Sequence, residues 1–302
     1  MENIKRLKDC VSNLKSIEGK SYFRKENICY LDTSGRVPLI RFRPFDKFEW
    51  LDMGFSTRIG GVSEGGQSSL NFDYARDNDA ENVRENYRRA AEAMGGDYKK
   101  LVLSDQVHDI KVEYVDEKFA AGENVEKKLK GIDGMVTDKP GIILATSFAD
   151  CVPLFFVDPV HKAIGNTHSG WRGTVGMIGR ATIGKMDEYF CSSPDEMICV
   201  IGPSICQKCY EVSEDVIEEV KKVYPKNECN EIFYPSKKDK DGQKYQLDLW
   251  AANYHQIKLA GIKEKNIYVS GLCTCCNSDV LFSHRASNGD RGTLNGFMGI
   301  RG

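Results

Sequence analysis

Apolar side chains recur at helical spacing in four segments of this sequence. The first, DAENVRENYRRAAEAM, places its apolar residues on one face, with Asp79 in the N-cap position and a glycine immediately after the segment. The third, at 213–224, begins with acidic residues, which suit the positive end of a helix dipole. The spacing predicts helices over residues 79–94, 174–190, 213–224 and 248–260.

Shorter apolar stretches indicate strands. KVEYVD at 111–116 alternates as a half-buried strand, and IILATS, VPLFFV and AIGNTH within 142–168 are apolar runs bounded by turn residues. Further strands are predicted at 197–202 and 266–270. Glycine-rich connections such as TRIGGVSEGG favour antiparallel pairs, so the predicted fold class is α+β rather than a doubly wound sheet.

Composition narrows the class of protein. The chain has 302 residues, 41% of them apolar, with no repeat of fixed period, which predicts one globular domain over residues 1–302. PSKKDKDGQ at 235–243, the most linker-like segment, is expected to be a surface loop. A net charge of −2 argues against nucleic acid or an anionic membrane as partner, and nothing indicates an oligomeric state.

Cysteine usage and the first residues suggest a location. Residues 1–20 are charged throughout, and no run approaches the roughly 18 apolar residues that span a bilayer, so we expect neither a signal peptide nor a membrane anchor. The eleven cysteines are odd in number and irregularly spaced, which fits a reducing compartment. A cytoplasmic protein is therefore expected.

Three residues at the ends of predicted strands carry candidate chemistry. His108 precedes the strand at 111–116, Cys151 opens VPLFFV, and His168 closes AIGNTH. Two imidazoles and one thiolate leave the fourth tetrahedral position open, as a catalytic zinc requires, and copper can use the same ligands. Alternatively, Cys151 is a nucleophile with His168 as its base. The spacing alone leaves both interpretations open.

The turn that follows His168 offers a second candidate feature. SGWRGT at 169–174 leads from a strand into a helix, and its two glycines, Gly170 and Gly173, free backbone N–H groups to bind an anion. Arg172 adds a guanidinium suited to phosphate or carboxylate. Alternatively, the glycines only make a tight turn while Trp171 fills the core.

Two cysteine clusters follow. Cys206 and Cys209 form CQKC, while Cys273, Cys275 and Cys276 form CTCC, which suggests a four-cysteine zinc site or a redox pair. Because the spacing in CTCC differs from the usual C-x-x-C pair, plain buried thiols are the favoured interpretation.

Several motifs together resemble one known family. They run in order along the chain: STRIGGVSEG with SLNF, DQVH, DGMVTD, ADC, THSGWRG, IGPSICQKCYEV and FSHRASNGDRG. The sequence resembles the YfiH/YlmD family, whose members are described as multicopper polyphenol oxidases or laccases and as purine nucleoside phosphorylases and adenosine deaminases. The likeness starts near residue 50, so residues 1–45 are expected to be an N-terminal extension packed on the domain.

The resemblance implies a fold and a metal site. It implies a single-domain, four-layer α/β/β/α sandwich, with zinc held by the histidine of QVH, the cysteine of ADC and the histidine of THSGWRG. Those positions are His108, Cys151 and His168 here. A cysteine bound to zinc is no longer a free nucleophile, so the attacking group would be an activated water or a phosphate oxygen.

The implied activity is cleavage of purine nucleosides (adenosine, inosine, guanosine and methylthioadenosine) by phosphate, together with deamination of adenosine. Beside Cys151, the expected catalytic residues are Arg172 for phosphate and Asp150 as an acid or base, with a structural acceptor as the alternative for Asp150. Matching motif segments supply weaker candidates for substrate contacts: Arg58, Asn71, His284 and Arg285. The HxE and PCxxC signatures of zinc deaminases are absent, so deamination would need a different arrangement.

Three other functions compete with this one. A copper-dependent polyphenol oxidase needs several coppers, which five histidines in the whole chain do not supply in the usual clusters. A Cys–His hydrolase or amidase acting on cell-wall precursors uses Cys151 as nucleophile. A non-enzymatic binding protein would turn over no nucleoside.

Overall fold

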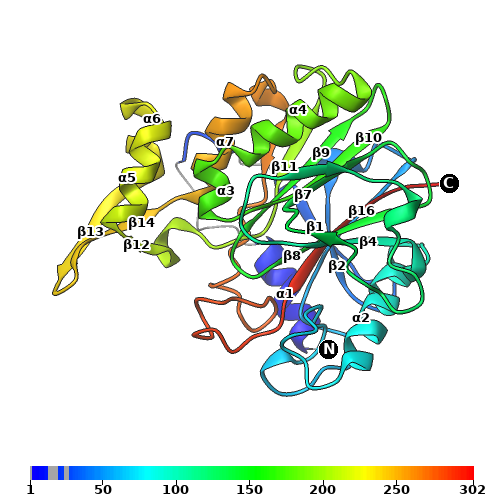
Figure 1. Cartoon of the computed structure of the whole chain (residues 1–302). Helices are drawn as coiled ribbons and strands as arrows, with labels where there is room; N and C mark the ends of the chain where they lie inside the picture. Colours follow the sequence, from blue (N-terminus) through cyan, green and yellow to red (C-terminus); the bar gives the residue numbers. More distant parts are fainter. Residues whose placement is uncertain (1, 13–19, 24–26) are drawn as a thin grey trace.

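Two large β-sheets lie face to face, with helices outside both, in the computed structural model of the chain (Figure 1). The structure describes residues 2–12, 20–23 and 27–302. The seven-stranded sheet has the order β1 (Cys29–Asp32), β2 (Leu39–Phe42), β3 (Leu51–Ser56), β16 (Leu294–Ile300), β8 (Ile143–Phe148), β4 (Leu101–Asp105) and β6 (Leu129–Lys130). The six-stranded sheet has the order β15 (Ile267–Val269), β11 (Ile198–Ile201), β9 (Val152–Asp158), β10 (Ala163–Ser169), β7 (Gly134–Thr137) and β5 (Val112–Tyr114).

The remaining elements cover or extend these sheets. A three-stranded sheet has the order β12 (Glu211–Ser213), β14 (Gly242–Leu247) and β13 (Phe233–Asp239). The α-helices are α1 (Glu2–Ser12), α2 (Ala80–Ala93), α3 (Trp171–Val175), α4 (Ile178–Phe190), α5 (Glu214–Val223), α6 (Lys226–Ile232) and α7 (Leu249–Leu259). Short 3₁₀ helices are η2 (Arg43–Phe45), η3 (Gly65–Gln67), η4 (Tyr98–Lys100), η5 (Glu117–Phe119), η6 (Gln207–Cys209) and η7 (Glu264–Asn266).

Three apolar layers hold these elements together. Along β9, Leu154 and Phe156 pack toward the helices that cover the six-stranded sheet, while Phe155 and Val157 face the other sheet. In β16, Phe297 packs under α2 on the opposite outer face. Each fully buried side chain of this kind contributes roughly 1.5–3 kcal/mol. The expected α+β class and four-layer α/β/β/α sandwich are confirmed.

Two predicted elements differ in the structure. The helix expected over 174–190 is two helices, because Met177 adopts a left-handed backbone, with φ of 63°, between α3 and α4. The loop expected at 235–243 is largely strand, since β13 and β14 form a hairpin there. Most side chains of β13 are exposed, so no apolar alternation marks it in the sequence.

The other predicted helices are confirmed as α2, α5 and α7, and the predicted strands as β5, β8, β9, β10, β11 and β15. Asp79 caps α2 by accepting a hydrogen bond from the backbone N–H of Glu81. None of the helices within the described ranges is long and apolar enough to cross a membrane.

Candidate metal centre

Strand register brings the three predicted ligands together. β9 and β10 are antiparallel, and Val152 pairs with Ser169, so Cys151 at the start of β9 lies beside the end of β10, where His168 stands. His108 follows β4 in the facing sheet. The site therefore lies beside the ends of strands from both sheets, and residues distant in sequence converge there by topology.

The distances within this group suit a metal. Cys151 Sγ lies 3.8 Å from His108 Nε2, and the three ligand atoms all lie within 4.8 Å of one another. Zn–S and Zn–N bonds of about 2.3 and 2.0 Å at a tetrahedral angle place S and N roughly 3.5 Å apart. The two imidazoles meet edge to face, with ring centroids 4.8 Å apart. Little movement is needed for one ion to contact all three.

A buried carboxylate, Asp133, orients both histidines. Its Oδ1 accepts hydrogen bonds from His168 Nδ1 at 2.8 Å and from the backbone N–H of His108 at 3.0 Å. Its Oδ2 accepts two more, from the backbone N–H groups of Val107 and Asp109. Because Nδ1 of His168 is occupied, Nε2 is left to face the thiol, as in carboxylate–histidine–zinc arrangements. Asp133 begins the DGMVTD motif, but nothing in its neighbouring residues indicates this role.

The backbone around the ligands is unusual. His108 and Asp150 both have positive φ, 64° and 86°, a region that residues other than glycine rarely adopt and that clusters at functional sites. Position 170 has room only for glycine, because an added Cβ would lie 2.8 Å from His108 Cδ2 and 3.2 Å from Cys151 Sγ. The chain is thus shaped so that the three ligands fit closely.

Electrostatics couple the thiol and the imidazole. Burial raises the pKa of the Cys151 thiol, but charge on His168 and hydrogen bonds with both imidazoles outweigh it and lower the pKa to about 6. Burial lowers the pKa of His168, while the Cys151 thiolate and Asp133 raise it to about 9. Without a metal, the pair is therefore thiolate and imidazolium at neutral pH. A thiolate paired with an imidazolium can act as a nucleophile, and a thiolate can also bind a metal cation.

The donor set bears on the choice between a metal site and a Cys–His nucleophile. A Cys–His nucleophile needs one imidazole, and His168 with Asp133 behind it already meets that need. The second imidazole, His108, is held on strained backbone at 3.8 Å from the same sulfur. Two nitrogens and one sulfur converging on one point fit a borderline metal such as zinc.

A cavity of about 180 Å³ opens onto the three ligands. Two cationic side chains border it, Arg291 and Lys127, together with two carboxylates, Asp73 and Asp105. The other lining residues are Gln106, His108, Ser147, Phe148, Ala149, Cys151, His168 and Thr293. Arg291 donates to Thr293 through Nη1, while its buried Nε has no hydrogen-bond partner in the described structure. Arg291 lies in the FSHRASNGDRG motif but was not among the predicted site residues.

Two residues predicted near the metal occupy supporting positions. Both carboxylate oxygens of Asp150 accept hydrogen bonds, Oδ1 from Thr274 Oγ1 at 2.6 Å and Oδ2 from the backbone N–H of Arg285 at 2.7 Å. This favours the structural alternative for Asp150. Arg172 is exposed, lies over the Trp171 ring and does not border the cavity.

The remaining predicted contacts lie outside the cavity lining. Arg58 donates to the backbone carbonyls of Gly66, Ser68 and Ser278 and packs over Phe282.

Asn71 is fully buried, accepts hydrogen bonds from the N–H groups of Asp73 and Thr293, and so positions two residues that do border the cavity. Gly173 is buried in α3.

His284 and Arg285 are exposed. Arg285 donates to the carbonyls of Cys209 and Glu211. Burial and the charge of Arg291 lower the pKa of His284, which is not among the residues that line the cavity.

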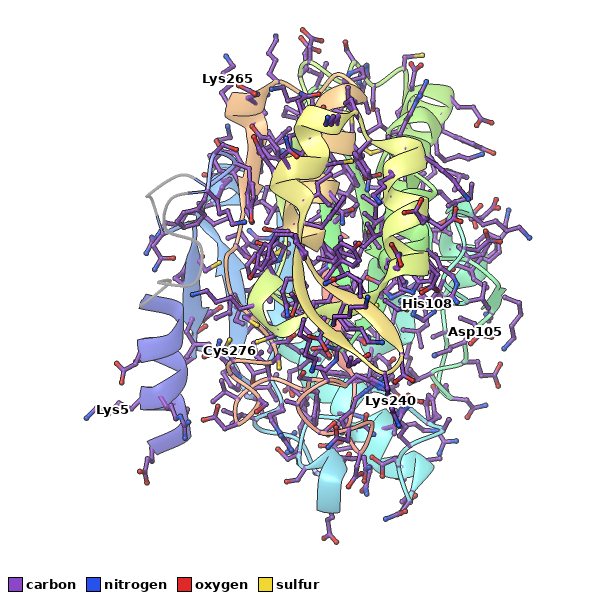
Figure 2. All side chains as sticks on the ribbon, turned by 90° about the vertical axis from the view of Figure 1, so that its left-hand side faces the viewer. Lys5, Asp105, His108, Lys240, Lys265 and Cys276 are labelled. Carbon is purple, nitrogen blue, oxygen red and sulfur yellow. The ribbon has the colours of Figure 1, made fainter. Side chains whose placement is uncertain are left out.

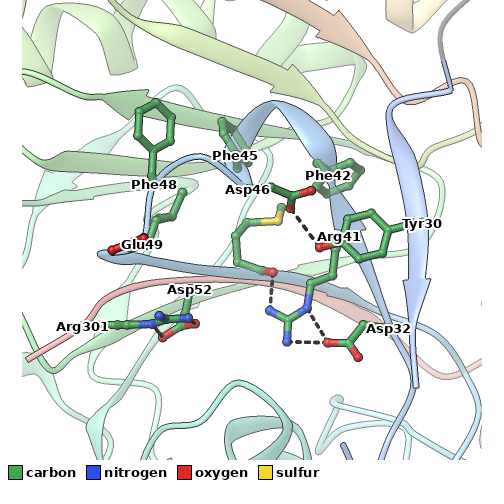
Figure 3. Close-up of a pocket in the computed structure, with 12 residues that line it drawn as sticks. Tyr30, Asp32, Arg41, Phe42, Phe45, Asp46, Phe48, Glu49, Asp52 and Arg301 are labelled. Atoms are coloured by element: carbon green, nitrogen blue, oxygen red, sulfur yellow. Dashed lines mark hydrogen bonds and ion pairs between the residues drawn. The ribbon is translucent and has the colours of Figure 1, made fainter. Parts of the chain in front are cut away.

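A larger cavity, of about 380 Å³, lies beside β1, β2 and β3 (Figure 3). Arg41 forms an ion pair there with Asp32 and donates to the carbonyl of Met53, and Arg301 pairs with Asp52. These charges satisfy one another, and the histidine–cysteine group is not among the lining residues. Size alone therefore does not identify the reactive site.

Known proteins share this sequence and fold. A family model described as "Multi-copper polyphenol oxidoreductase laccase" matches residues 52–301. "Purine nucleoside phosphorylase YlmD" of Geobacillus stearothermophilus is 34% identical over 250 residues, 82% of this chain and 89% of that protein. "Adenosine deaminase RL5" from an unknown prokaryotic organism is 35% identical over 235 residues, 76% and 87% of the two chains. The crystal structure of Bacillus licheniformis hypothetical protein YfiH matches with a TM-score of 0.82 at 30% identity, covering 90% of this chain and 99% of that one.

Fold and site define an α+β sandwich protein with a His–Cys–His group at the ends of strands from its two large sheets. The chain belongs to the multi-copper polyphenol oxidoreductase laccase family, in which the YfiH and YlmD proteins are its relatives, as the sequence motifs predicted. The names of these relatives support an enzyme.

Proposed function

We propose that the protein is a zinc-dependent purine nucleoside phosphorylase whose metal is held by His108, Cys151 and His168. One observation carries the proposal: these three ligands converge at a cavity that also presents Arg291 and Lys127. The names of several relatives supply the reaction class. The substrates are adenosine, inosine, guanosine or methylthioadenosine, and inorganic phosphate.

The reaction exchanges one bond at the sugar. The bond between C1′ and the purine nitrogen breaks, a phosphate oxygen bonds to C1′, and the departing base takes up a proton. When bound, zinc supplies a Lewis acid beside the reacting atoms. Asp133 keeps the Nδ1 proton on His168, so that the imidazole presents Nε2 and stays in one orientation.

The cations of the cavity give phosphate a place to bind. Arg291 is half-buried at the cavity, and its Nε has no hydrogen-bond partner in the described structure, so we assign its guanidinium to a phosphate oxygen. Lys127 adds a second positive charge. We assign phosphate to these two side chains rather than to Arg172, because Arg172 is exposed and outside the lining.

The size of the cavity limits how the substrate sits. Ligand pockets typically measure roughly 300–1,000 Å³, while this one measures about 180 Å³. We therefore place phosphate and the reacting carbon inside the cavity, and the rest of the nucleoside over its rim.

Adenosine deamination is the second candidate, since one relative carries that name. There water replaces the amino group at C6 of the purine, and ammonia leaves. Zinc deaminases use a glutamate to move the protons. The carboxylates that border this cavity are Asp73 and Asp105, so either would have to take that role.

The copper oxidase in the family description fits the site less well. Multicopper oxidation needs clustered histidines, and the described residues bring only His108 and His168 to one point. His161 and His255 are engaged elsewhere with Asp158 and Glu231. Bound copper at the same three ligands is compatible with the structure, but a multicopper cluster is not.

Chromatography of adenosine incubated with the purified protein tests the proposal. We expect adenine to form only when phosphate and metal are both present, and to stop after chelation. Inosine formed without phosphate would instead favour deamination. Untouched adenosine under all conditions would refute nucleoside chemistry, and activity that survives chelation but is lost in Cys151→Ser would favour the Cys–His hydrolase.

A further inference from the structure

Four cysteines outside the metal centre meet at one point of the fold. Cys206 and Cys209 follow β11, while Cys273 and Cys276 follow β15. β11 and β15 are parallel neighbours, so the loops after them leave the same edge of the six-stranded sheet. The four Sγ atoms all lie within 4.8 Å of one another. Figure 2 labels Cys276, which lies apart from His108 in that view.

The spacing of these four cysteines argues against plain buried thiols. Cys273 and Cys276 are separated by two residues, as are Cys206 and Cys209, so the set consists of two C-x-x-C pairs. Paired C-x-x-C motifs are typical of structural zinc sites. The extra cysteine of CTCC, Cys275, is not a member of the group and hid this pattern.

The sulfur separations match metal ligation. Cys209 Sγ and Cys206 Sγ lie 3.5 and 3.9 Å from Cys276 Sγ. Four sulfurs at about 2.3 Å from a tetrahedral zinc lie roughly 3.8 Å from one another. A disulfide needs about 2.05 Å, so forming one here would require these atoms to move much farther. The ten cysteines whose side chains the structure describes are all free thiols.

Backbone N–H groups already point at the sulfurs. Cys273 Sγ accepts hydrogen bonds from the N–H groups of Cys206, at 3.2 Å, and Cys276, at 3.4 Å. Such bonds stabilise negative charge on a thiolate and orient it, as the groups around a bound metal do. Each loop donates to the same sulfur, so the two loops are arranged around one centre.

We propose that Cys206, Cys209, Cys273 and Cys276 form a structural zinc site that cross-links the loops after β11 and β15. Four thiolates complete a tetrahedral shell and leave no position for substrate. A soft donor set selects zinc over the hard cations magnesium and calcium. This proposal does not depend on the reaction proposed above.

The cross-linked loops also hold the backbone next to Cys151. The two loops hold Asp150, the residue before Cys151: Ile205 N–H donates to its carbonyl, and Thr274 Oγ1 donates to its carboxylate. Asp150 has a left-handed backbone that its surroundings must maintain. Zinc at the four cysteines thus holds the segment that presents Cys151.

The test uses the full chain with His108→Ala and His168→Ala, so that the metal centre no longer retains zinc. After purification with a reductant and removal of loosely bound metal, we expect elemental analysis to find about one zinc per chain, and X-ray absorption to show sulfur alone at about 2.3 Å. Adding Cys276→Ser to this background should lower the zinc content to near zero. Adding Cys275→Ser, the neighbouring thiol outside the group, should leave it unchanged.

A measurement on the unaltered protein covers the case in which a variant fails to fold. In the zinc-loaded chain, Cys209 and Cys276 should resist alkylation while the exposed Cys191 reacts, and a strong chelator should make all three reactive. Alkylation of Cys276 as fast as Cys191 despite zinc would overturn the proposal. So would zinc absent from the double variant, iron in its place, or a disulfide within the group in reduced, freshly purified protein.

Discussion

Replacement of Asp133 by Asn tests whether this carboxylate contributes to metal binding as well as to the stability of the fold. The carboxylate accepts four hydrogen bonds, two on each oxygen, including those from His168 Nδ1 and the His108 N–H. An amide keeps one accepting oxygen, so two donors lose their acceptor and face an NH₂ group. Two hydrogen bonds to a buried charge together contribute about 3–6 kcal/mol.

The same change should weaken metal binding. Loss of a carboxylate behind a ligand histidine typically costs about 10–100-fold in metal affinity. We expect this loss for Asp133→Asn in addition to the loss of stability. The affinity is measured as the buffered zinc concentration at which half of the Cys151 thiol is protected from alkylation. Cys151 belongs only to the His108–Cys151–His168 group, so this signal reports zinc binding at that group alone.

Asp158→Asn is the matched control. Asp158 is also buried and also accepts four hydrogen bonds, from Ser192, the ring of His161 and two backbone N–H groups, but it lies at the far end of β9 from Cys151. Its variant should lose comparable stability in urea unfolding yet keep its zinc affinity within about twofold, since distant sites couple weakly.

Both variants need a stabilising osmolyte, because the loss is a large share of the roughly 5–15 kcal/mol of a typical domain. Equal zinc affinity in the Asp133 and Asp158 variants would refute the role given to Asp133.

Three further results are expected. Gly170→Ala should weaken zinc binding by about 10-fold or more, since its Cβ would lie 2.8 Å from an imidazole ligand, while Gly184→Ala, with nothing within 4 Å, should not; the same zinc titration decides. In metal-free protein, alkylation of Cys151 should rise through pH about 6 and level off by pH 8, because a lowered pKa leaves the thiolate populated above it, and a midpoint near an ordinary thiol's ~8.5 would contradict this. Arg291→Ala should raise the KM for phosphate by about 10-fold or more, whereas Arg172→Ala should change it little; steady-state kinetics showing the reverse order would return phosphate to the turn after His168.

The sequence predicted those parts of the fold whose signals are local. α2 was predicted because its cap and its apolar face lie within one segment, 79–94. The break at Met177 was missed because apolar periodicity continues across it, while the backbone changes hand at a single residue. β13 was missed because its exposed side chains give no alternation.

The candidate site shows the same division. The three candidate ligands could be named from residue chemistry and motif, whereas Asp133 reaches His168 only through the pairing of β7 with β10, which is not local. Arg172 is a neighbour of His168 in sequence but points to solvent, while Arg291 arrives from the segment before β16. Proximity in sequence therefore indicated Arg172, whereas the residues that border the cavity indicate Arg291.

Phosphorus NMR of adenosine and inorganic phosphate mixed with the zinc-loaded protein tests the central claim most directly. We predict that the phosphate signal is replaced by that of a sugar 1-phosphate, and that neither chelated protein nor Cys151→Ala produces this signal. Release of purine with no phosphorylated sugar, or an undiminished product signal from Cys151→Ala, would contradict the account.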